Sequence, residues 1–575
     1  MAITTTNSTK VKPFLFLIKC FKTRKVVIKM KSTNNYSFSQ VPQVNIPRSA
    51  FQRDNGYKTT MNTGDLVPVY VDEILPGDTF SISPTLFTRL ATPIAPIMDN
   101  MYLDIQWFFV PNRLIWSNWQ RFNGEQDNPD DSTDYVMPTV NPITPQAQSI
   151  YDYMGLPINV TLKDIVSLPF RAYNLIYNEW YRDQNLMDSV PVNKGDGPDD
   201  PNDYIILTRC KQHDYFTSAL PWLQKGQTVD LPIGGQASII DPTPANGYFL
   251  GSNEPWLAGI EMNPGGQPEI TDDVYGPSAI TLNTGAGHLG LASFGRMGTN
   301  PTTVWAGSLD EVLSRNAYAD LSTASAATIN SLRQAFQIQR LLERDARGGT
   351  RYTEILRSHF GVISPDARLQ RPEFLGGGST RININPVAQT SSSDASTPQG
   401  NLAAYGQGTL HNGGVSKSFT EHGYIIGLAS IRADLTYQQG INRMWFRKTR
   451  WDHYWPALSH LGEQAILNKE IYADGSDADE EVFGYQERYA EYRYKPSLIT
   501  GKFRSTYAQP LDFWHLAQKF ENRPALNAEF IQTAVPLERA IAVTNEPQFI
   551  VDCYFHTRCV RPMPMYGVPG LIDHF

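Results

Sequence analysis

The sequence predicts a mainly β protein whose strands form an antiparallel sandwich or barrel of Greek-key type. Three observations predict this fold. Several segments alternate apolar and polar side chains, these segments lie far apart along the chain, and glycine and proline number 42 and 40 among 575 residues. Alternation is typical of half-buried strands, and distant strands joined by long connections are typical of Greek-key folds.

Four segments carry the strand pattern. In residues 65–74, three valines fall on one face at period two, and residues 101–110 alternate strictly. Residues 423–437 and 548–560 are the other two candidates. The residues expected to share a face are Val67, Val69 and Val71 in the first segment, Met101, Leu103, Ile105, Trp107 and Phe109 in the second, and Phe549, Val551, Cys553 and Phe555 in the fourth.

Helices are expected only in the connections between strands. Residues 328–347 have large apolar side chains at a spacing of roughly three to four, which predicts an amphipathic helix, and residues 170–184 predict a second helix. Residues 232–310 are instead rich in Gly, Pro, Asn and Thr. Long loops of this kind are usually functional or disordered, so we expect a recognition loop on the surface.

The N-terminal residues form a basic arm, which we assign to residues 1–37. The first 53 residues contain ten lysines and arginines and no acidic residue. Such arms commonly contact nucleic acid, although a solvated tail has the same composition. Met30 opens a stretch that looks like a natural start, so a third interpretation is that residues 1–29 are an upstream extension of the reading frame.

The overall composition limits the classes of function. The net charge of −8 gives no global nucleic-acid footprint, so any contact with nucleic acid must be a local patch. Only 18% of residues are charged, while 28 Tyr, 27 Phe and 11 Trp make the chain aromatic-rich, a combination that also describes interface cores. Four cysteines suggest no disulfide framework, and no apolar run approaches the ~18 residues of a membrane helix.

The usual motifs of enzymes and metal proteins are not matched. The glycines at 376–380 lack the spacing of a phosphate-binding loop, and residues 460–464 lack the second histidine of a zinc protease motif. Cys553 and Cys559 fall on one face of the predicted strand and His556 on the other, so the three cannot share an ion. We therefore predict no catalytic residues, no cofactor, no metal and no enzyme.

Three acidic clusters do not fit a calcium-binding loop either. They lie at residues 127–131, 196–203 and 476–481. The simplest interpretation of each cluster is a solvated turn.

One local patch, residues 441–455, interleaves cations with aromatic side chains. Cations that hold phosphates beside aromatics that stack on unpaired bases are the ingredients of single-strand binding. The candidate DNA contacts are Arg443, Arg447, Lys448, Arg450 and Trp451. An equally good interpretation is that the aromatics are core residues and the arginines make cation–π or interface contacts.

Long blocks of the chain carry a resemblance to a known family. They include FSQVPQVNIPRSAFQRDNGYKTT, RLATPIAPIMDNMYLDIQWFFVPNRLIWSNW, LLERDARGGTRYTEILRSHFGVISPDARLQRPEFLGG, DHYWPALSHLGEQAILNKEIY and RPMPMYGVPGLIDHF. These blocks closely resemble the major capsid protein of the Microviridae, in the gokushovirus branch of small single-stranded DNA phages. The resemblance covers nearly everything from about Phe38 to Phe575.

The resemblance implies a single domain over residues 38–575, an eight-stranded antiparallel jelly roll with long loop and helical insertions. Copies of such a protein form the icosahedral shell of the virion around circular single-stranded DNA, after assembly in the cytoplasm of the bacterial host. The family also implies a small basic DNA-binding protein, an internal scaffolding protein and a pilot protein as partners. Residues 232–310 match poorly, where the family carries a protruding insertion associated with a host receptor.

The apolar C-terminal tail, residues 561–575, follows the last predicted strand. Its prolines cannot donate to a β-ladder, which suits an extended arm lying on a surface. We expect it to dock onto its own or a neighbouring subunit, with Tyr566, Leu571, Ile572 and Phe575 as anchors.

An alternative class of function remains open from the composition. Proteins rich in β-strands, aromatics, Gly and Pro often bind sugars, so a glycan-binding or glycan-cleaving β-sandwich is the second hypothesis. A DNA-binding regulator is less favoured, because the chain is acidic and has no helix-turn-helix or finger signature.

Overall fold

The computed structural model describes most of the chain between residues 47 and 566. The described residues are 47–226 except 129 and 133, 229, 238–240, 290–292, 306–308, 318–320, 329–348, 354, 357–359, 370–391 and 398–566. The chain divides into two compact units, Ala50–Arg561 and a second that joins Met1–Ser49 with Pro562–Phe575. The core clusters and helices belong to Ala50–Arg561.

Eight strands pair in a nested order. The first pairs with the last (β2 with β20), the second with the seventh (β3 with β15), the third with the sixth (β4 with β13) and the fourth with the fifth (β5 with β12), all antiparallel. Their bounds are β2 Asn55–Met61, β3 Val67–Ile74, β4 Thr79–Leu90, β5 Met101–Pro111, β12 Glu373–Ala388, β13 Leu402–Leu410, β15 Gly423–Ala433 and β20 Phe549–Arg561. Nested pairing of eight strands is the jelly roll, as the resemblance implies.

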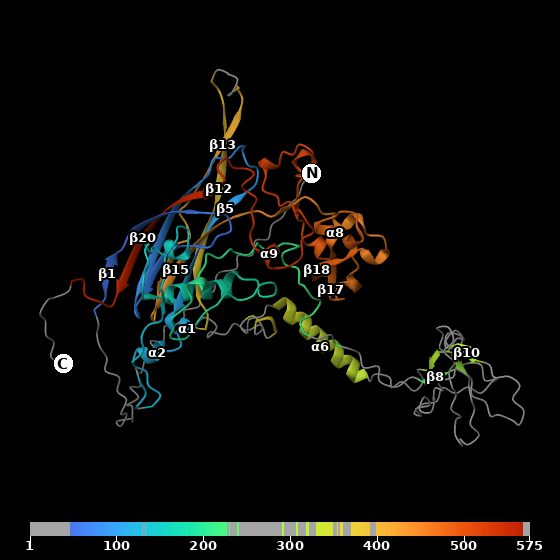
Figure 1. Ribbon diagram of the computed structural model, residues 1–575, viewed down its shortest axis with the longest axis horizontal. Helices are drawn as coiled ribbons and strands as arrows, with labels where there is room; N and C mark the ends of the chain where they lie inside the picture. The colour runs from blue at the N-terminus through green and yellow to red at the C-terminus, as the bar shows by residue number, and fades with distance from the viewer. Residues whose placement is uncertain are drawn as a thin grey trace, which may run out of the picture. The chain divides into compact units, whose positions relative to one another are not determined.

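The strands gather in one curled sheet (Figure 1). β12 is the strand that turns the corner: Glu373–Ile382 pairs with β5, and the following residues, Asn383–Ala388, pair with β13. The curl therefore has two halves, β3-β15-β5-β12 and β12-β13-β4-β20-β2. Two short strands, β1 (Ser49–Gln52) on β20 and β14 (Val415–Ser418) on β4, complete the ten-stranded sheet.

Two glycines, Gly377 and Gly378, let β12 lie close to its neighbours. A Cβ on Gly378 would lie 2.7 Å from the Asn412 side-chain oxygen and 2.8 Å from the Gly413 Cα. The glycine-rich run that fails as a phosphate loop is therefore part of a strand that needs close backbone approach.

The first hydrophobic core fills the inside of the curl. The predicted faces of the second and fourth segments both lie in it, and on β20 Phe549, Val551, Cys553 and Phe555 are fully buried. The Trp107 ring packs edge-on against Phe555 at 5.8 Å, and its indole N–H donates to the Gly413 carbonyl oxygen at 2.8 Å. The shared face predicted for these four residues of β20 is confirmed.

One predicted face is wrong at a single residue. Val67 and Val69 lie in the first core, but Val71 packs against a second core on the other side of the sheet. The pairing of β3 with β15 shifts register between Gly427 and Leu428, which leaves Val69 as an extra residue on β3. Because a β-bulge reverses the alternation that follows it, Tyr70 takes the inward position expected of Val71.

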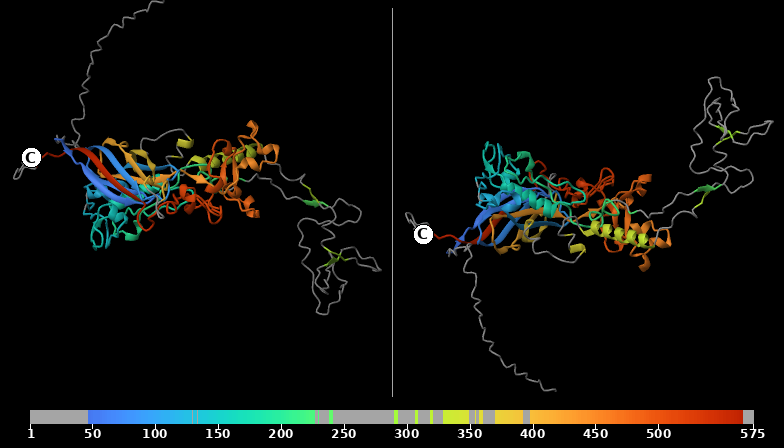
Figure 2. Two further views of the ribbon diagram at one scale, coloured as in Figure 1. Left: turned by 90° about the horizontal axis from the view of Figure 1, so that it is seen from above. Right: turned by 90° about the horizontal axis from the view of Figure 1, so that it is seen from below.

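The second core covers the outer face of β5 and β15. Phe108 and Val110 are as buried as the residues that point inward, so the expectation that residues 101–110 are only half-buried is wrong. The covering layer comes from residues 112–208 (Figure 2). Its elements are α1 Asn112–Ile115, α2 Trp119–Phe122, β6 Thr139–Val140, α3 Ile150–Tyr153, β7 Ile165–Val166, α4 Leu168–Ile176, the π-helix Tyr177–Tyr181 and a 3-10 turn Pro201–Asp203. α4 and the π-helix together confirm the helix predicted at 170–184.

A third, smaller core lies under the long insertion between β15 and β20. Tyr215, Phe216, Ile466 and Phe530 are among its buried members. The regular elements of the insertion are β16 Thr436–Tyr437, β17 Glu463–Leu467, α8 Asn468–Ile471, β18 Val482–Glu487, β19 Ser497–Leu498 and α9 Ala528–Ile531, linked by 3-10 turns.

α6 (Ile329–Gly348) confirms the helix predicted at 328–347, but a different face is buried. Ala335 and Ala346 are buried, whereas Phe336, Ile338 and Leu341 are exposed. The helix is tied to the insertion by an ion pair between Arg347 and Glu463. Among the described helices, none has the length and apolarity needed to cross a membrane.

The predicted recognition loop contains three short strands. β8 (Ser238–Ile240) pairs with β11 (Tyr318–Asp320), and β9 (Gly290–Ala292) pairs with β10 (Ala306–Ser308). The rest of residues 232–310 lies outside the described residues.

Candidate nucleic-acid interface

The aromatic and basic patch lies in the insertion between β15 and β20 as a series of 3-10 turns. The turns are Arg443–Trp445, Arg450–Asp452 and Pro456–Leu458. The Asn442 side chain caps the first turn by accepting from the Met444 N–H at 3.0 Å, and Asp452 accepts from the Thr449 N–H at 2.7 Å. Since a 3-10 turn has three residues per turn, successive side chains point in different directions.

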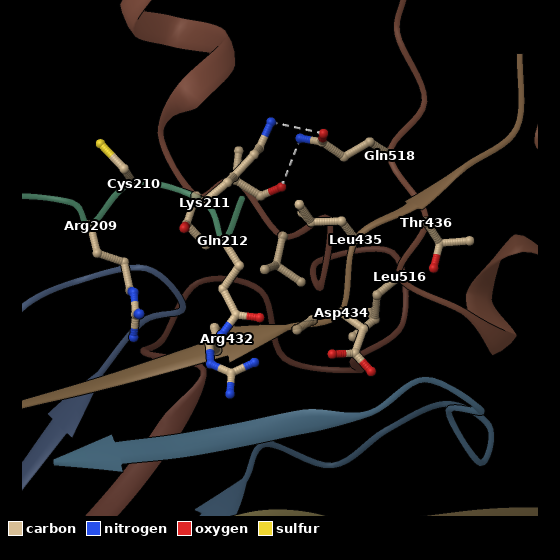
Figure 3. Close-up of a pocket in the computed structure, with 14 residues that line it drawn as sticks. Arg209, Cys210, Lys211, Gln212, Arg432, Asp434, Leu435, Thr436, Leu516 and Gln518 are labelled. Carbon is tan, nitrogen blue, oxygen red and sulfur yellow. Dashed lines mark hydrogen bonds between the residues drawn. The ribbon is translucent and has the colours of Figure 1, made fainter. Parts of the chain in front are cut away.

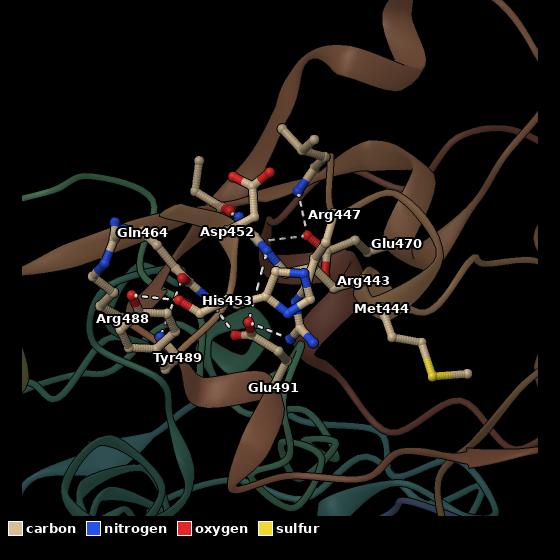
Figure 4. Close-up of polar contacts among 12 residues, drawn as sticks. Arg443, Met444, Arg447, Asp452, His453, Gln464, Glu470, Arg488, Tyr489 and Glu491 are labelled. Atoms are coloured by element: carbon tan, nitrogen blue, oxygen red, sulfur yellow. Dashed lines mark hydrogen bonds and ion pairs between the residues drawn. The ribbon is translucent and has the colours of Figure 1, made fainter. Parts of the chain in front are cut away.

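Two of the predicted contacts point into the protein. The Arg443 guanidinium lies 2.9 Å from the Glu470 carboxylate and donates to the Ala465 carbonyl oxygen at 2.7 Å. The Arg447 guanidinium lies 2.9 Å from the Glu491 carboxylate and 4.4 Å from the centre of the Tyr492 ring. Figure 4 shows both arginines converging on these carboxylates.

The carboxylates of this cluster are themselves buried. Burial raises the pKa of Glu470, against the opposing effects of the Arg443 charge and a hydrogen bond from the Leu467 N–H. Glu491 also accepts from the Gln464 side-chain amide at 2.6 Å. Because their charge is neutralised inside the subunit, Arg443 and Arg447 are structural rather than available to phosphates.

The other three predicted contacts are exposed. Lys448, Arg450 and Trp451 lie on the surface, and the Arg450 guanidinium stacks over Trp455 at 4.6 Å and over Trp451 at 5.3 Å. The Trp455 indole N–H donates to the Arg450 carbonyl oxygen at 3.0 Å, which fixes that ring. Within the described part of the chain, neither Lys448 nor Arg450 has a carboxylate within ion-pair distance.

The structure thus divides the patch between the two interpretations of the sequence. The aromatics are not core residues, since Trp445, Trp451 and Trp455 are exposed, but Arg443 and Arg447 do make the internal contacts of the second interpretation. Sequence reasoning missed Trp455 as the platform for Arg450, and Glu491 as the partner of Arg447. Glu491 is 44 residues from Arg447 in the chain, so no local pattern could reveal the pair.

Comparison with known proteins decides the class. The family model described as "Capsid protein (F protein)" matches residues 39–571. The chain belongs to this capsid protein family.

Three relatives are each named "Capsid protein VP1". The one from Bdellovibrio phage phiMH2K is 50% identical, over 94% of this chain and 99% of its own length. Those from Chlamydia phage 1 and Spiroplasma virus 4 are 44% and 37% identical, over 94% and 93% of this chain and 99% and 97% of their own lengths. The chain is a major capsid protein of the Microviridae, a structural subunit rather than an enzyme, and the glycan-binding alternative is not favoured.

The two cysteines and the histidine of β20 lie on opposite faces of that strand. As predicted, Cys553 and Cys559 are buried while His556 points outward. His556 also pairs with Asp54 at 2.9 Å. Among the described residues, no group of three or more His, Cys, Asp or Glu side chains could hold a metal ion.

A small pocket beside β15 contains a buried lysine (Figure 3). Its volume is about 20 Å³, room for about one water molecule. Lys211 donates to the Gln518 side-chain oxygen at 2.9 Å and to the Phe530 carbonyl oxygen at 2.5 Å, and its ammonium lies 4.4 Å from the Phe530 ring centre. These contacts join residues 209–212 to the insertion and give the lysine a structural role.

The predicted anchors of the C-terminal tail are only partly described. Tyr566 is 80% exposed. Leu571, Ile572 and Phe575 lie outside the described residues.

Proposed function

We propose that copies of this capsid protein close into an icosahedral shell around a circular single-stranded DNA genome, and that Lys448, Arg450 and Trp451 contact the DNA. The observation that carries the DNA site is the Arg450 guanidinium, which lies over the rings of two exposed tryptophans and lacks a carboxylate partner among the described residues. Stacking holds the cation in place without neutralising it.

The chemistry of the site fits a single strand. Lys448 and Arg450 attract phosphates, and the exposed Trp451 ring offers a face on which an unpaired base stacks. Such contacts need no particular base sequence, which a packaged genome requires. Two neutralised phosphates correspond to a slope of about −1.4 in a plot of log affinity against log salt concentration.

The experiment replaces Lys448→Glu together with Arg450→Glu. We expect particles to form in normal number with a reduced fraction containing DNA, measured by sedimentation and by the absorbance ratio of purified particles. The matched control is Lys163→Glu with Lys194→Glu, which makes the same charge change at two other exposed lysines. A normal proportion of full particles in the first variant would contradict the DNA site.

The proposal extends to the terminal arms and the insertion. Residues 1–37 add a basic arm, residues 232–310 form a protruding insertion that meets the host receptor, and residues 561–575 dock on a subunit surface. Support comes from the basic composition of the first arm and from the exposed Tyr566 in the last. Deleting residues 566–575 tests the docking arm: we expect a lower yield of stable particles, and a normal yield would contradict it.

The proposed partners follow from the family. They are a small basic DNA-binding protein, an internal scaffolding protein and a pilot protein, with assembly in the cytoplasm of the bacterial host. Co-purification of each from infected cells, with and without the double variant, tests which of them depends on the DNA site.

A further inference from the structure

A second surface of the insertion presents large apolar side chains to solvent. We call it the apolar face; its members are Ile441, Met444, Trp445, Tyr494 and Leu498. Trp445 is 75% exposed and Leu498 is 63% exposed. Interface cores are enriched in Trp, Tyr and Met, and contiguous exposed apolar surface on a soluble subunit usually marks an interaction site.

The backbone holds this face in a fixed shape. In the 3-10 turn Arg443–Trp445, Arg443 points inward to Glu470, which leaves Met444 and Trp445 pointing outward. Figure 4 shows Met444 directed away from the carboxylates. On the other side of the face, β19 pairs with β16, with Leu498 opposite Tyr437, which ties Leu498 to the strand that precedes Ile441 in the chain.

The segment that carries Trp445 also lines a pocket, through Asn442 and Arg443. The pocket has a volume of about 80 Å³, and Ile441, Tyr494 and Leu498 contribute to its wall. Two of its charged members neutralise each other, since Arg443 pairs with Glu470. Arg504, which also lines the pocket, donates to the neutral Gln438 carbonyl oxygen at 2.6 Å. A partner can therefore cover the Arg443 and Glu470 side of the pocket without leaving an unpaired charge buried there.

We infer that the apolar face is covered by a second copy of this chain, in a two-fold contact in which Trp445 of each copy enters the pocket beside Leu498 of the other. A projecting side chain and a receiving pocket on the same surface are what an isologous contact requires, since each copy supplies both parts. A capsid subunit meets other copies of itself on its lateral surfaces, and buried Trp and Tyr anchors carry most of the binding energy in such interfaces. The inference rests on the proposed shell.

The experiment uses mixed assembly. One chain carries only W445C and a second, tagged chain carries only L498C, and the two are expressed together with the other proteins of the phage. Assembled particles are treated with a short bismaleimide, and the covalent species are identified by mass spectrometry. We expect a cross-linked dimer that joins residue 445 of one chain to residue 498 of the other.

The control replaces L498C by Y405C, another exposed position that lies on β13. No 445–405 dimer is expected. Particles without a 445–498 dimer, or with equal yields of the two dimers, overturn the contact. When Lys448→Glu and Arg450→Glu are added to both chains, particles that keep a normal DNA content and still form the 445–498 dimer contradict the DNA site while supporting the contact, so the two proposals fail separately.

A second variant measures the energetic role of Trp445. Trp445→Ala should lower the yield of particles at least tenfold while leaving the thermal unfolding of the free subunit unchanged, because the side chain is exposed in the subunit. Tyr405→Ala is the control and should retain normal yield. Normal assembly of Trp445→Ala would overturn the inference.

Discussion

The Arg171 guanidinium and the Asp199 carboxylate form a fully buried ion pair, with Nη2–Oδ1 and Nε–Oδ2 distances of 2.6 and 2.7 Å. The Tyr204 hydroxyl donates to the same carboxylate at 2.6 Å. Arg171 also donates to the Ile115 and Gly195 carbonyl oxygens. The pair fixes the 193–204 segment to α4, so the acidic cluster at 196–203 is not simply the solvated turn expected from sequence.

The pH dependence of stability should report this pair. Burial acts to raise the pKa of Asp199, but the hydrogen bonds from Arg171 and Tyr204 and the Arg171 charge lower it below the ordinary 3.8. A lowered folded pKa stabilises the subunit above the ordinary value, and this contribution is lost as the pH falls below about 4 through the folded pKa.

The reference variant is Asp199→Asn. We expect its free energy of unfolding at pH 7 to be about 3–5 kcal/mol lower than that of the native chain, because the substitution leaves Arg171 buried without its counter-charge. The difference between the native chain and the variant should shrink on acidification from pH 5 to pH 2 in urea titrations. Asp188→Asn, at an exposed position, is the control. Equal stability of the native chain and Asp199→Asn at pH 7 would contradict the prediction.

Lys211 should make stability depend on pH in the alkaline range, whereas Asp199 does so in the acidic range. Burial lowers the pKa of its ammonium from 10.5 to about 8. Between these values the unfolded chain binds more protons than the folded chain, so the contribution of this residue to stability rises with pH. Between pH 8 and pH 10.5, the free energy of unfolding of the native chain should rise relative to that of Lys211→Met by up to roughly 3 kcal/mol, at about 1.4 kcal/mol per pH unit. A pH-independent difference between the two unfolding free energies would exclude this.

Gly378 should tolerate no side chain. The Cβ of Gly378→Ala would press on Asn412 and Gly413 at 2.7–2.8 Å, and forcing extra volume into a packed site costs about 1–3 kcal/mol. Gly56→Ala on β2 is the matched control, since its Cβ would meet only the Cys553 carbonyl oxygen at 3.8 Å. Thermal unfolding of both variants measures the difference. Similar midpoints would show that β12 can move away.

The two kinds of arginine in the patch should behave differently on truncation. Arg447→Ala removes the main partner of the buried Glu491 carboxylate and should lower the free energy of unfolding by about 1–3 kcal/mol. Arg450→Ala removes an exposed side chain and should change stability by less than about 0.5 kcal/mol. Chemical denaturation of the free subunit measures both. An equal loss in the two variants would show that Arg450 is also structural.

The sequence predicts where the strands lie better than it predicts which other parts of the chain pack against them. Period-two alternation identifies the buried face of β20 because that strand has core on one side only. The same rule fails for Phe108, because a second core covers β5, and for Val71, because a bulge depends on the partner strand. In the candidate site, local composition identifies the exposed Lys448 and Arg450. It could not separate them from Arg447, whose partner Glu491 comes from a distant turn.

The pairing of β2 with β20 has a consequence for biosynthesis. Asn55–Met61 lies opposite Phe549–Phe555, so the first jelly-roll strand finds its partner only when nearly the whole chain has been translated. At 5–20 residues per second, the ribosome needs about 25–100 s to make the intervening residues. During that time the β20-facing edge of β2 lacks its partner, and the fold closes only on full-length chains. Translation products that end before Phe549 therefore lack the last strand of the sheet.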